Sequence, residues 1–554
     1  MILTGQPIDE IANDGQPNTV RRGSLVARWW GTIYQLGEPI GRRSVEQLLE
    51  TCTNSTSRSL RQIDAWFAPG APARSLHGTF LLWIADQATG EQVCFIDHAG
   101  LFRAAFSEDA VALKLLPLLE ASGKTLDDFD VDAAVELLTI GYVDSHRSMV
   151  RGLRFITHDQ VFYWGPNGRR QTRKKNLGGL QEPPEIDFET FFERFAQTLR
   201  GETVSVDLTG GFDSRLLAAL LHQAGLNFEV SMTGTEAHKD VRLARKVART
   251  LGKDLVLYEH PAETTNEDLE RFFQDLDGHL DLINFDRLHR WYKQREARGI
   301  TTTISGSGGE LFAEYWWLQD APRFNAARPR LGRLYDLRMA SMPMPFESFG
   351  AAAAESARTC RDRVVHSLGR HRQATNTSTY DQIFAVERMP ALLGPTVTAI
   401  NRGSLNLLTP LNDWDLMAIG FQLPRRQRVF RQFHRAKIEA AHPRAARCAS
   451  TERVSCGYTL RAGLLDPPRY LFDKAERLTR KVIQRLRSKN WRYESPNHPQ
   501  VHARIRAGSW AQTLIQELIE DTILAPEVSA ENLRDGDLGR ALSVALMRRR
   551  LRSP

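Results

Sequence analysis

The stretch VSVDLTGGFDSRLL, residues 204–217, decides how the chain folds. Residues 204–208 are mostly apolar and β-branched, which predicts a short buried strand. The glycine pair in residues 209–214 predicts a tight turn, and a helix is expected to begin at Leu216. Because free N–H groups and a helix dipole favour negative charge, such a turn predicts an anion site. The residues expected to line it are Thr209, Gly210, Gly211 and Ser214.

The turn also carries Asp213, which cannot hold phosphate by charge. Asp213 must therefore hold a metal ion, cap the turn or bond a neighbouring amide. The stretch lacks the Gly-x-x-x-x-Gly-Lys-Ser/Thr pattern of the Walker loop. It resembles instead the pyrophosphate loop Ser-Gly-Gly-x-Asp-Ser of the ATP pyrophosphatases, with Thr209 in the serine position. That resemblance implies an enzyme that splits ATP into AMP and pyrophosphate while it activates a carboxylate or carbonyl group.

Strands and helices are expected to alternate beyond this turn. Apolar runs predict strands at 227–233, 254–258 and 301–304, and helical patterns are expected at 216–224 and 236–251. This alternation predicts a doubly wound parallel sheet with its ligand at the carboxyl ends of the strands. In the resembled family the main chain of the second strand meets the adenine, so Val230 and Met232 are the candidates. Asp240 matches a family aspartate or is simply a helix N-terminal charge.

A second informative stretch is TTTISGSGGELF, residues 301–312. It resembles Ser-Gly-Glu-Gly-x-Asp-Glu-Leu-Phe of the asparagine synthetases, in which backbone and acidic groups face nucleotide and magnesium. Gly309 stands where the family has aspartate, whereas Glu310 is retained. The resemblance implies Asp213 and Glu310 as ligands of Mg²⁺, with Glu310 also a catalytic candidate and helix capping its alternative. The nucleotide side would be lined by Gly306, Ser307 and Gly308.

The first 185 residues predict a β-rich part. Residues 25–34 suit a strand pair, and residues 77–86 and 92–103 suit two strands joined by the turn 87–90. A helix is expected at 108–116. Gly78-Thr79-Phe80 through Asp86, followed by Asp97 and Gly100, resembles the N-terminal glutaminase domain of asparagine synthetases. The resemblance implies an Ntn-type β-sandwich for residues 1–185.

The chain departs from those glutaminases at their nucleophile. They use a cysteine at the mature N-terminus, whereas position 2 is Ile2 and the first cysteine is Cys52, in a predicted helix end. We therefore expect no glutamine hydrolysis. The resemblance is then to members such as β-lactam synthetases and lasso-peptide cyclases, which form amides from an amine already on the substrate.

Two further family positions are altered. Residues 404–413 resemble Glu-x-Arg-x-Pro-Phe-Leu-Asp, with Asn406 in the glutamate position, and asparagine cannot act as a general base. The family then places a catalytic lysine in the region 450–455, where the cation is Arg453. Arg453 is expected to bind phosphate, with a solvated surface arginine as the alternative.

The resemblance implies an ATP pyrophosphatase domain over 186–465, ending in a helical part, and a basic helical extension over 466–554. Residues 469–492 form a basic amphipathic pattern, which indicates a helix packed on the core or a site for an acidic partner. The basic tail 548–552 is expected to fray.

Composition sets wider limits. The chain has 554 residues, of which 42% are hydrophobic and 25% charged, and a net charge of +7 from 73 basic and 66 acidic residues. This mild excess does not indicate nucleic-acid binding. The five cysteines show no metal or disulfide spacing, and neither a signal peptide nor a membrane span is visible. These features favour the cytoplasm.

Together these patterns predict an ATP-dependent ligase that adenylates a carboxylate of a small molecule or peptide for attack by an amine. A macrolactam cyclase or another natural-product amide synthase fits the missing cysteine. The alternatives are glutamine-hydrolysing synthesis of the asparagine synthetase type and a nucleotide-binding scaffold. The sequence indicates no oligomeric state.

Overall fold

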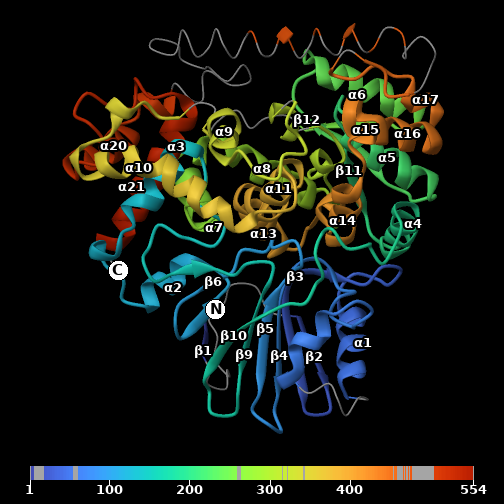
Figure 1. Ribbon diagram of the computed structural model, residues 1–554, viewed down its shortest axis with the longest axis horizontal. Coiled ribbons are helices and arrows are strands. Elements are labelled where there is room, and N and C mark those ends of the chain that lie inside the picture. The colour runs from blue at the N-terminus through green and yellow to red at the C-terminus, as the bar shows by residue number, and fades with distance from the viewer. Residues whose placement is uncertain are drawn as a thin grey trace.

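The computed structural model describes residues 2–4, 18–53, 60–258, 264–314, 316–320, 322–340, 343–452, 454–457 and 504–552, with scattered residues between 464 and 479. Arg453 and most of the basic stretch 469–492 lie outside the described residues. Figure 1 shows a β-rich part at one end of the molecule and a mixed helix and sheet part at the other. This arrangement confirms the predicted order of a β-rich part followed by an α/β part.

The N-terminal sandwich consists of two antiparallel sheets. The larger sheet has the order β10-β9-β5-β4-β3-β2, with strands β2 (Asn18–Arg22), β3 (Leu25–Tyr34), β4 (His77–Asp86), β5 (Gln92–Ile96), β9 (Gln160–Trp164) and β10 (Arg170–Lys174). The smaller sheet has the order β1-β7-β6-β8, with strands β1 (Ile2–Thr4), β7 (Ala110–Ala112), β6 (Ala105–Phe106) and β8 (Arg154–Phe155). The helices of the N-terminal sandwich are α1 (Arg42–Thr53), α2 (Leu115–Ala121) and α3 (Val131–Ile140).

Alternation along β4 explains why this part forms two packed layers. Leu81 and Trp83 join one apolar cluster with residues of the smaller sheet, whereas Phe80, Leu82 and Ile84 join the main core on the other face. Successive side chains of a strand point to opposite faces, so one strand contributes to both layers. Large side chains fill the space between the sheets: Trp30, Trp83, Phe102, Phe162 and Trp164.

Three local predictions in this part are wrong. Residues 25–34 form one ten-residue strand rather than a pair. The strand expected over 92–103 ends at Ile96, because the Asp97 carboxylate accepts backbone N–H groups of residues 99, 101 and 102 and so turns the chain. In place of a helix over 108–116, β7 precedes α2, whose first turn contains Pro117, where a missing N–H costs nothing.

The parallel sheet follows α4 (Phe188–Thr198) and has the order β13-β12-β11-β14-β15. Its strands are β11 (Val204–Asp207), β12 (Glu229–Thr233), β13 (Leu255–Tyr258), β14 (Thr302–Ile304) and β15 (Asn406–Leu408), and all adjacent pairs are parallel. The connecting helices include α5 (Asp213–Gln223), α6 (Lys239–Thr250), α7 (Asn266–Asp275) and α8 (Leu282–Ala297). The predicted doubly wound sheet is therefore present, with β15 as an additional strand.

Helices surround this sheet and continue to the end of the described chain. They are α9 (Leu331–Leu334), α10 (Ala351–Leu368), α11 (Asn376–Ile383), α12 (Met389–Leu392), α13 (Gly394–Asn401), α14 (Trp414–Gln422), α15 (Arg425–Arg428), α16 (Gln432–Ala441), α17 (Pro443–Ala446), α20 (Ser509–Glu520) and α21 (Asp535–Arg552). In the described part of the chain, no single helix is long and apolar enough to cross a membrane. One bent pair of helical segments, 376–392 with 394–401, meets the length and composition of a span, and only those.

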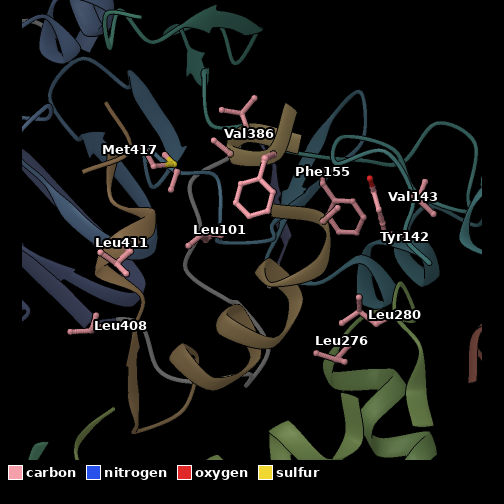
Figure 2. Close-up of a cluster of buried hydrophobic side chains, with 14 of the residues drawn as sticks. Leu101, Tyr142, Val143, Phe155, Leu276, Leu280, Val386, Leu408, Leu411 and Met417 are labelled. Atoms are coloured by element: carbon pink, nitrogen blue, oxygen red, sulfur yellow. The ribbon is translucent and has the colours of Figure 1, made fainter. Parts of the chain in front are cut away.

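One continuous apolar core joins the two parts. Figure 2 shows side chains from the N-terminal sandwich, such as Leu101 and Phe155, in one buried cluster with side chains from the second part, such as Val386, Leu411 and Met417. The sandwich is thus packed firmly onto the helices around the parallel sheet.

The last helix also belongs to this core. α21 packs against α3, α8 and α20 (Figure 1), and Arg540 Nη1 donates to the carbonyl of Leu138 at 2.8 Å. Arg548 is buried and pairs with Asp521 at 2.8 Å, and Arg549 pairs with Glu517. The expectation that residues 548–552 fray is therefore wrong, because ion pairs and packing hold this end of α21 in place.

Candidate active site

The central strands place two loops side by side. β11 lies between β12 and β14, and the chain reverses its direction of winding at the β11–β14 pair. The carboxyl ends of both strands lie at the same edge of the sheet. Loop 209–214, called the first loop below, therefore meets loop 305–310, called the second loop. In open parallel sheets this switch point is where ligands bind.

Hydroxyl groups brace the first loop. The Ser214 hydroxyl accepts the backbone N–H of Thr209 at 3.0 Å and lies 2.9 Å from Thr209 Oγ1, which in turn accepts the N–H of Gly211 at 3.1 Å. Asp213 begins α5, so the free N–H groups of the helix start beside the loop. This is the geometry of a cradle for an anion.

Gly210 closes the back of that cradle. A Cβ atom there would lie 2.8 Å from Thr451 Cγ2 and 3.0 Å from Leu243 Cδ1. The Gly210 carbonyl accepts the N–H of Thr451 at 3.0 Å. The loop therefore rests directly on segment 449–451, and a side chain at 210 would separate them.

The second loop depends on its glycines for the same reason. A Cβ at Gly306 would lie 2.8 Å from the Ser214 nitrogen, and one at Gly308 would lie 2.6 Å from the Asn412 side chain. Gly308 also has a φ of 97°, which favours glycine. Ser307 lies between them and accepts a hydrogen bond from Asn412 Nδ2 at 2.9 Å. The helix expected after this loop is a single 3₁₀ turn, Gly309–Phe312.

The position of the Asp213 side chain explains why residue 309 is glycine rather than the aspartate of the resembled pattern. A Cβ at this position would lie 2.4 Å from both Cγ and Oδ1 of Asp213. The Asp213 carboxylate thus occupies the space that a side chain at 309 would need. An aspartate at 309 is incompatible with Asp213 in this position.

Asp213 is held ionised by two basic side chains. Its Oδ1 lies 2.7 Å from His434 Nε2 and 3.2 Å from Arg431 Nη1. Burial alone would raise the pKa of Asp213, but the Arg431 charge and the His434 contact outweigh burial and lower the pKa. Both basic residues lie at the start of α16, and neither was predicted.

Glu310 behaves in the opposite way. Burial, followed by the charge of Asp213, raises the pKa of Glu310 to about 7. One carboxylate oxygen accepts the N–H of Gly308 at 3.2 Å. Asp213 and Glu310 therefore repel one another, and a cation placed between them would favour the ionised form of both.

The other predicted residues lie on β12, α6 and β15, and not all of these elements bring them to the loops. Val230 and Met232 are on β12, which pairs with β11 at Val206–Val230 and ends at the same edge of the sheet. Asp240 lies in the first turn of α6. Asn406 begins β15 at the opposite end, where its side chain contacts Thr32 at 2.7 Å and Thr302 at 3.2 Å. The structure does not bring Asn406 to the loops.

The sequence reasoning missed Arg431, His434 and Glu452. Arg431 Nη2 lies 3.4 Å from Glu452 Oε1 and its guanidinium carbon lies 5.3 Å from the Phe212 ring centre. The only available signal was the spacing of Arg431 and His434, which places both on one helix face. No motif marks them, so only the packing of α16 against α5 reveals their position.

A junction cluster connects this edge to the N-terminal sandwich. It consists of Arg74, His77 and Asp415, which are buried, and Asp413, which is partly buried. His77 Nδ1 lies 2.7 Å from Asp413 Oδ2, and Arg74 pairs with Asp415. Since Asn412 bonds Ser307 and the next residue bonds His77, the sandwich reaches the second loop through two consecutive side chains.

Comparison with known proteins agrees with this geometry. Residues 196–445 match the family model described as asparagine synthase. No curated protein matches the chain. The match covers all five parallel strands, both loops and the start of α16. The match supports an asparagine synthetase-like family for the domain formed by residues 196–445.

Proposed function

We propose that the chain is an ATP-dependent amide synthase that adenylates a carboxylate, releases pyrophosphate and passes the acyl group to an amine. The observation that carries the proposal is the hydroxyl-braced loop 209–214 placed at the switch point against Glu310. Within an asparagine synthase domain, this arrangement favours ATP-dependent formation of a carbon–nitrogen bond.

In the proposed reaction a substrate carboxylate oxygen attacks the α-phosphorus of ATP. The bond from that phosphorus to the bridging oxygen breaks, and pyrophosphate leaves with the electron pair. The free N–H groups at the start of α5 and the hydroxyls of Thr209 and Ser214 would bind the leaving group. An amine then attacks the acyl carbon, AMP leaves, and loss of a proton from nitrogen gives the amide.

The acidic residues beside the loop fit a magnesium ion in donor type. Mg²⁺ prefers carboxylate oxygens and usually shares them with substrate phosphates. Asp213 and Glu310 supply such oxygens, and the raised pKa of Glu310 indicates a place where added positive charge is favourable. When bound, the ion would neutralise phosphate charge; this chain's residues would orient it.

We further propose that the amine does not come from glutamine. All five cysteines are buried. Burial raises the pKa of Cys456 to about 11 and raises the pKa of Cys94 and Cys360. A nucleophilic cysteine requires the reverse, an accessible thiol with a lowered pKa. The amine would then belong to the substrate, as in a macrolactam cyclase or another natural-product amide synthase acting on a small molecule or peptide in the cytoplasm.

The test follows exchange of labelled pyrophosphate into ATP. Purified protein would be incubated with ATP, Mg²⁺ and pools of carboxylates. We expect exchange with one pool. In Asp213→Asn the exchange rate should fall about a thousandfold, because a charge that positions the reacting phosphates is removed; this corresponds to about 4 kcal/mol of barrier. Glu267→Gln, which changes an exposed acidic residue in the first turn of α7, is the matched control and should retain exchange.

Other products would contradict the proposal. Formation of ADP rather than AMP would exclude adenylation. Release of glutamate from glutamine would exclude the substrate-borne amine and favour the asparagine synthetase type of reaction. Binding of ATP with no exchange in any pool would favour a nucleotide-binding scaffold.

A further inference from the structure

Of the residues that the structure describes, the carboxylates around the first loop outnumber the basic side chains that contact them. Asp213, Glu310 and Glu452 approach it from three segments. Among the described residues, the basic side chains that contact these carboxylates are Arg431 and His434. Arg215, although buried beside the loop, donates to the carbonyls of Cys448 and Ala449 instead. Within the described part of the chain, Arg431 is therefore the guanidinium placed to offset these acidic groups when a phosphate binds.

Arg431 is held less tightly than the structural arginines nearby. Its contacts to Asp213 and Glu452 measure 3.2 and 3.4 Å, and 17% of its side chain is exposed. Arg295 of α8 lies 2.6 Å from Asp207, the last residue of β11, and 3% of its side chain is exposed. Charge-assisted hydrogen bonds between nitrogen and carboxylate are usually about 2.7–2.9 Å. The Arg431 pairs are thus long and partly open to solvent.

The backbone positions Arg431 at some cost. Phe430 and Arg431 have φ values of 53° and 54°, so two consecutive residues that are not glycine adopt the left-handed region. Side chains other than glycine are disfavoured there. Arg435 Nε donates to the Phe430 carbonyl at 3.0 Å and supports this turn. Strain retained at a site is typical of residues kept for function.

Two residues next to Arg431 have buried polar atoms with no hydrogen-bond partner among the described residues. These atoms include Glu452 Oε2 and His434 Nδ1, from side chains that are 9% and 0% exposed. Buried polar groups are usually satisfied, so these atoms indicate a place where a further ligand or ion completes the set. Glu452 already contacts Arg431, and His434 already contacts Asp213.

We propose that Arg431 is an exchangeable counter-ion, which neutralises Asp213 and Glu452 when the site is empty and turns to the phosphate chain when a metal–nucleotide complex binds. Only the second part of this inference, that Arg431 binds the phosphate chain, rests on the proposed function. In the first state the guanidinium takes the place of a divalent cation between carboxylates. In the second, the cation takes the carboxylates, and the planar guanidinium binds phosphate oxygens with two N–H groups.

The proposal predicts two effects of opposite sign for Arg431→Gln. Without nucleotide, Mn²⁺ should bind about tenfold more tightly, because its competitor for Asp213 and Glu452 is gone. With Mg²⁺ present, a non-hydrolysable ATP analogue should bind about tenfold more weakly, because a phosphate ligand is lost. Free Mn²⁺ would be counted by electron paramagnetic resonance and the analogue by calorimetry, on the full chain.

Two further variants keep the test decisive. Arg426→Gln removes the same charge from an exposed neighbour and should change neither affinity. Arg431→Lys keeps the charge and should bind Mn²⁺ as the unaltered chain does. If Arg431→Gln does not fold, Arg431→Met removes the same charge and replaces it as the decisive variant. Unchanged or weaker Mn²⁺ binding in folded Arg431→Gln, or tighter binding in Arg431→Lys, would overturn the counter-ion. If the unaltered chain binds no nucleotide analogue, the proposed function fails, while the Mn²⁺ comparison still decides the role of Arg431.

Discussion

The junction cluster and the charged residues around the first loop are both partly or fully buried, yet they are built differently. In the junction cluster, Arg74 faces Asp415 and His77 faces Asp413, so each acidic group has its own basic partner. Around the loop, Asp213 is shared by two basic residues, and one of them, Arg431, also pairs with Glu452. Matched charge is typical of a structural joint, and unmatched charge is typical of a site that receives a ligand.

The largest expected effect comes from breaking the joint. Arg74→Met leaves Asp415 buried without its partner, which typically costs about 3–5 kcal/mol. We expect the free energy of unfolding in urea to fall by that amount. The double variant Arg74→Met/Asp415→Leu should recover most of the loss, because both charges are removed.

An exposed pair provides the control for this prediction. Arg361 bonds Asp336 through two nitrogens, yet about half of each side chain is exposed. Arg361→Met should therefore change stability by less than about 1 kcal/mol. If Arg74→Met were equally mild, the junction cluster would not hold the two parts together.

A middle-sized effect is expected at Gly309. Gly309→Ala places a methyl group 2.4 Å from the Asp213 carboxylate, so either the loop or the carboxylate must move. Overpacking of this kind costs about 1–3 kcal/mol. We also expect weaker binding of the ATP analogue, measured by calorimetry, since Asp213 loses its position.

Gly369→Ala is the matched control for that change. No atom lies within 4 Å of a Cβ at Gly369, and its φ is −58°. The substitution should be neutral or slightly stabilising. Equal behaviour of the two variants would show that the contact between positions 309 and 213 is unimportant.

The smallest effects should appear in the dependence of stability on pH, in two different windows. The pKa of Glu310 is about 7 in the folded chain and about 4.5 when unfolded, so stability falls as the pH rises from about 4.5 to 7. Glu310 is partly exposed, so we expect a difference of about 1–2 kcal/mol. Glu310→Gln should remove that fall.

His77 should act at higher pH. Burial lowers its pKa, but the charge and hydrogen bond of Asp413 and the charge of Asp415 outweigh both burial and Arg74, so the pKa is raised. Stability from the His77 pair is therefore complete below about pH 6.5 and is lost as the pH rises through the folded pKa. His77→Gln should lose more stability at pH 6 than at pH 9. Urea titrations at pH 4.5, 6, 7.5 and 9 would separate the windows, and coincident windows would contradict the assignment.

Local patterns were sufficient to predict four of the five parallel strands and the two loops. Apolar runs identified β11, β12, β13 and β14, and parallel topology alone explains why loops 209–214 and 305–310 meet. The sequence could not predict how Asp97 turns the chain, since three backbone contacts to one carboxylate leave no pattern. Arg431 and Glu452 were missed for a related reason, because tertiary packing of unrelated segments places them by the loop.

The packing of α21 has a consequence for how the protein is made. The Arg540 side chain bonds the Leu138 carbonyl across 402 positions of sequence, so α3 emerges from the ribosome long before its partner helix. At synthesis rates of roughly 5–20 residues per second, the gap lasts roughly 20–80 s. Throughout that interval the apolar side chains of α3 that α21 later covers lack this cover. The nascent chain should therefore depend on chaperones late in translation.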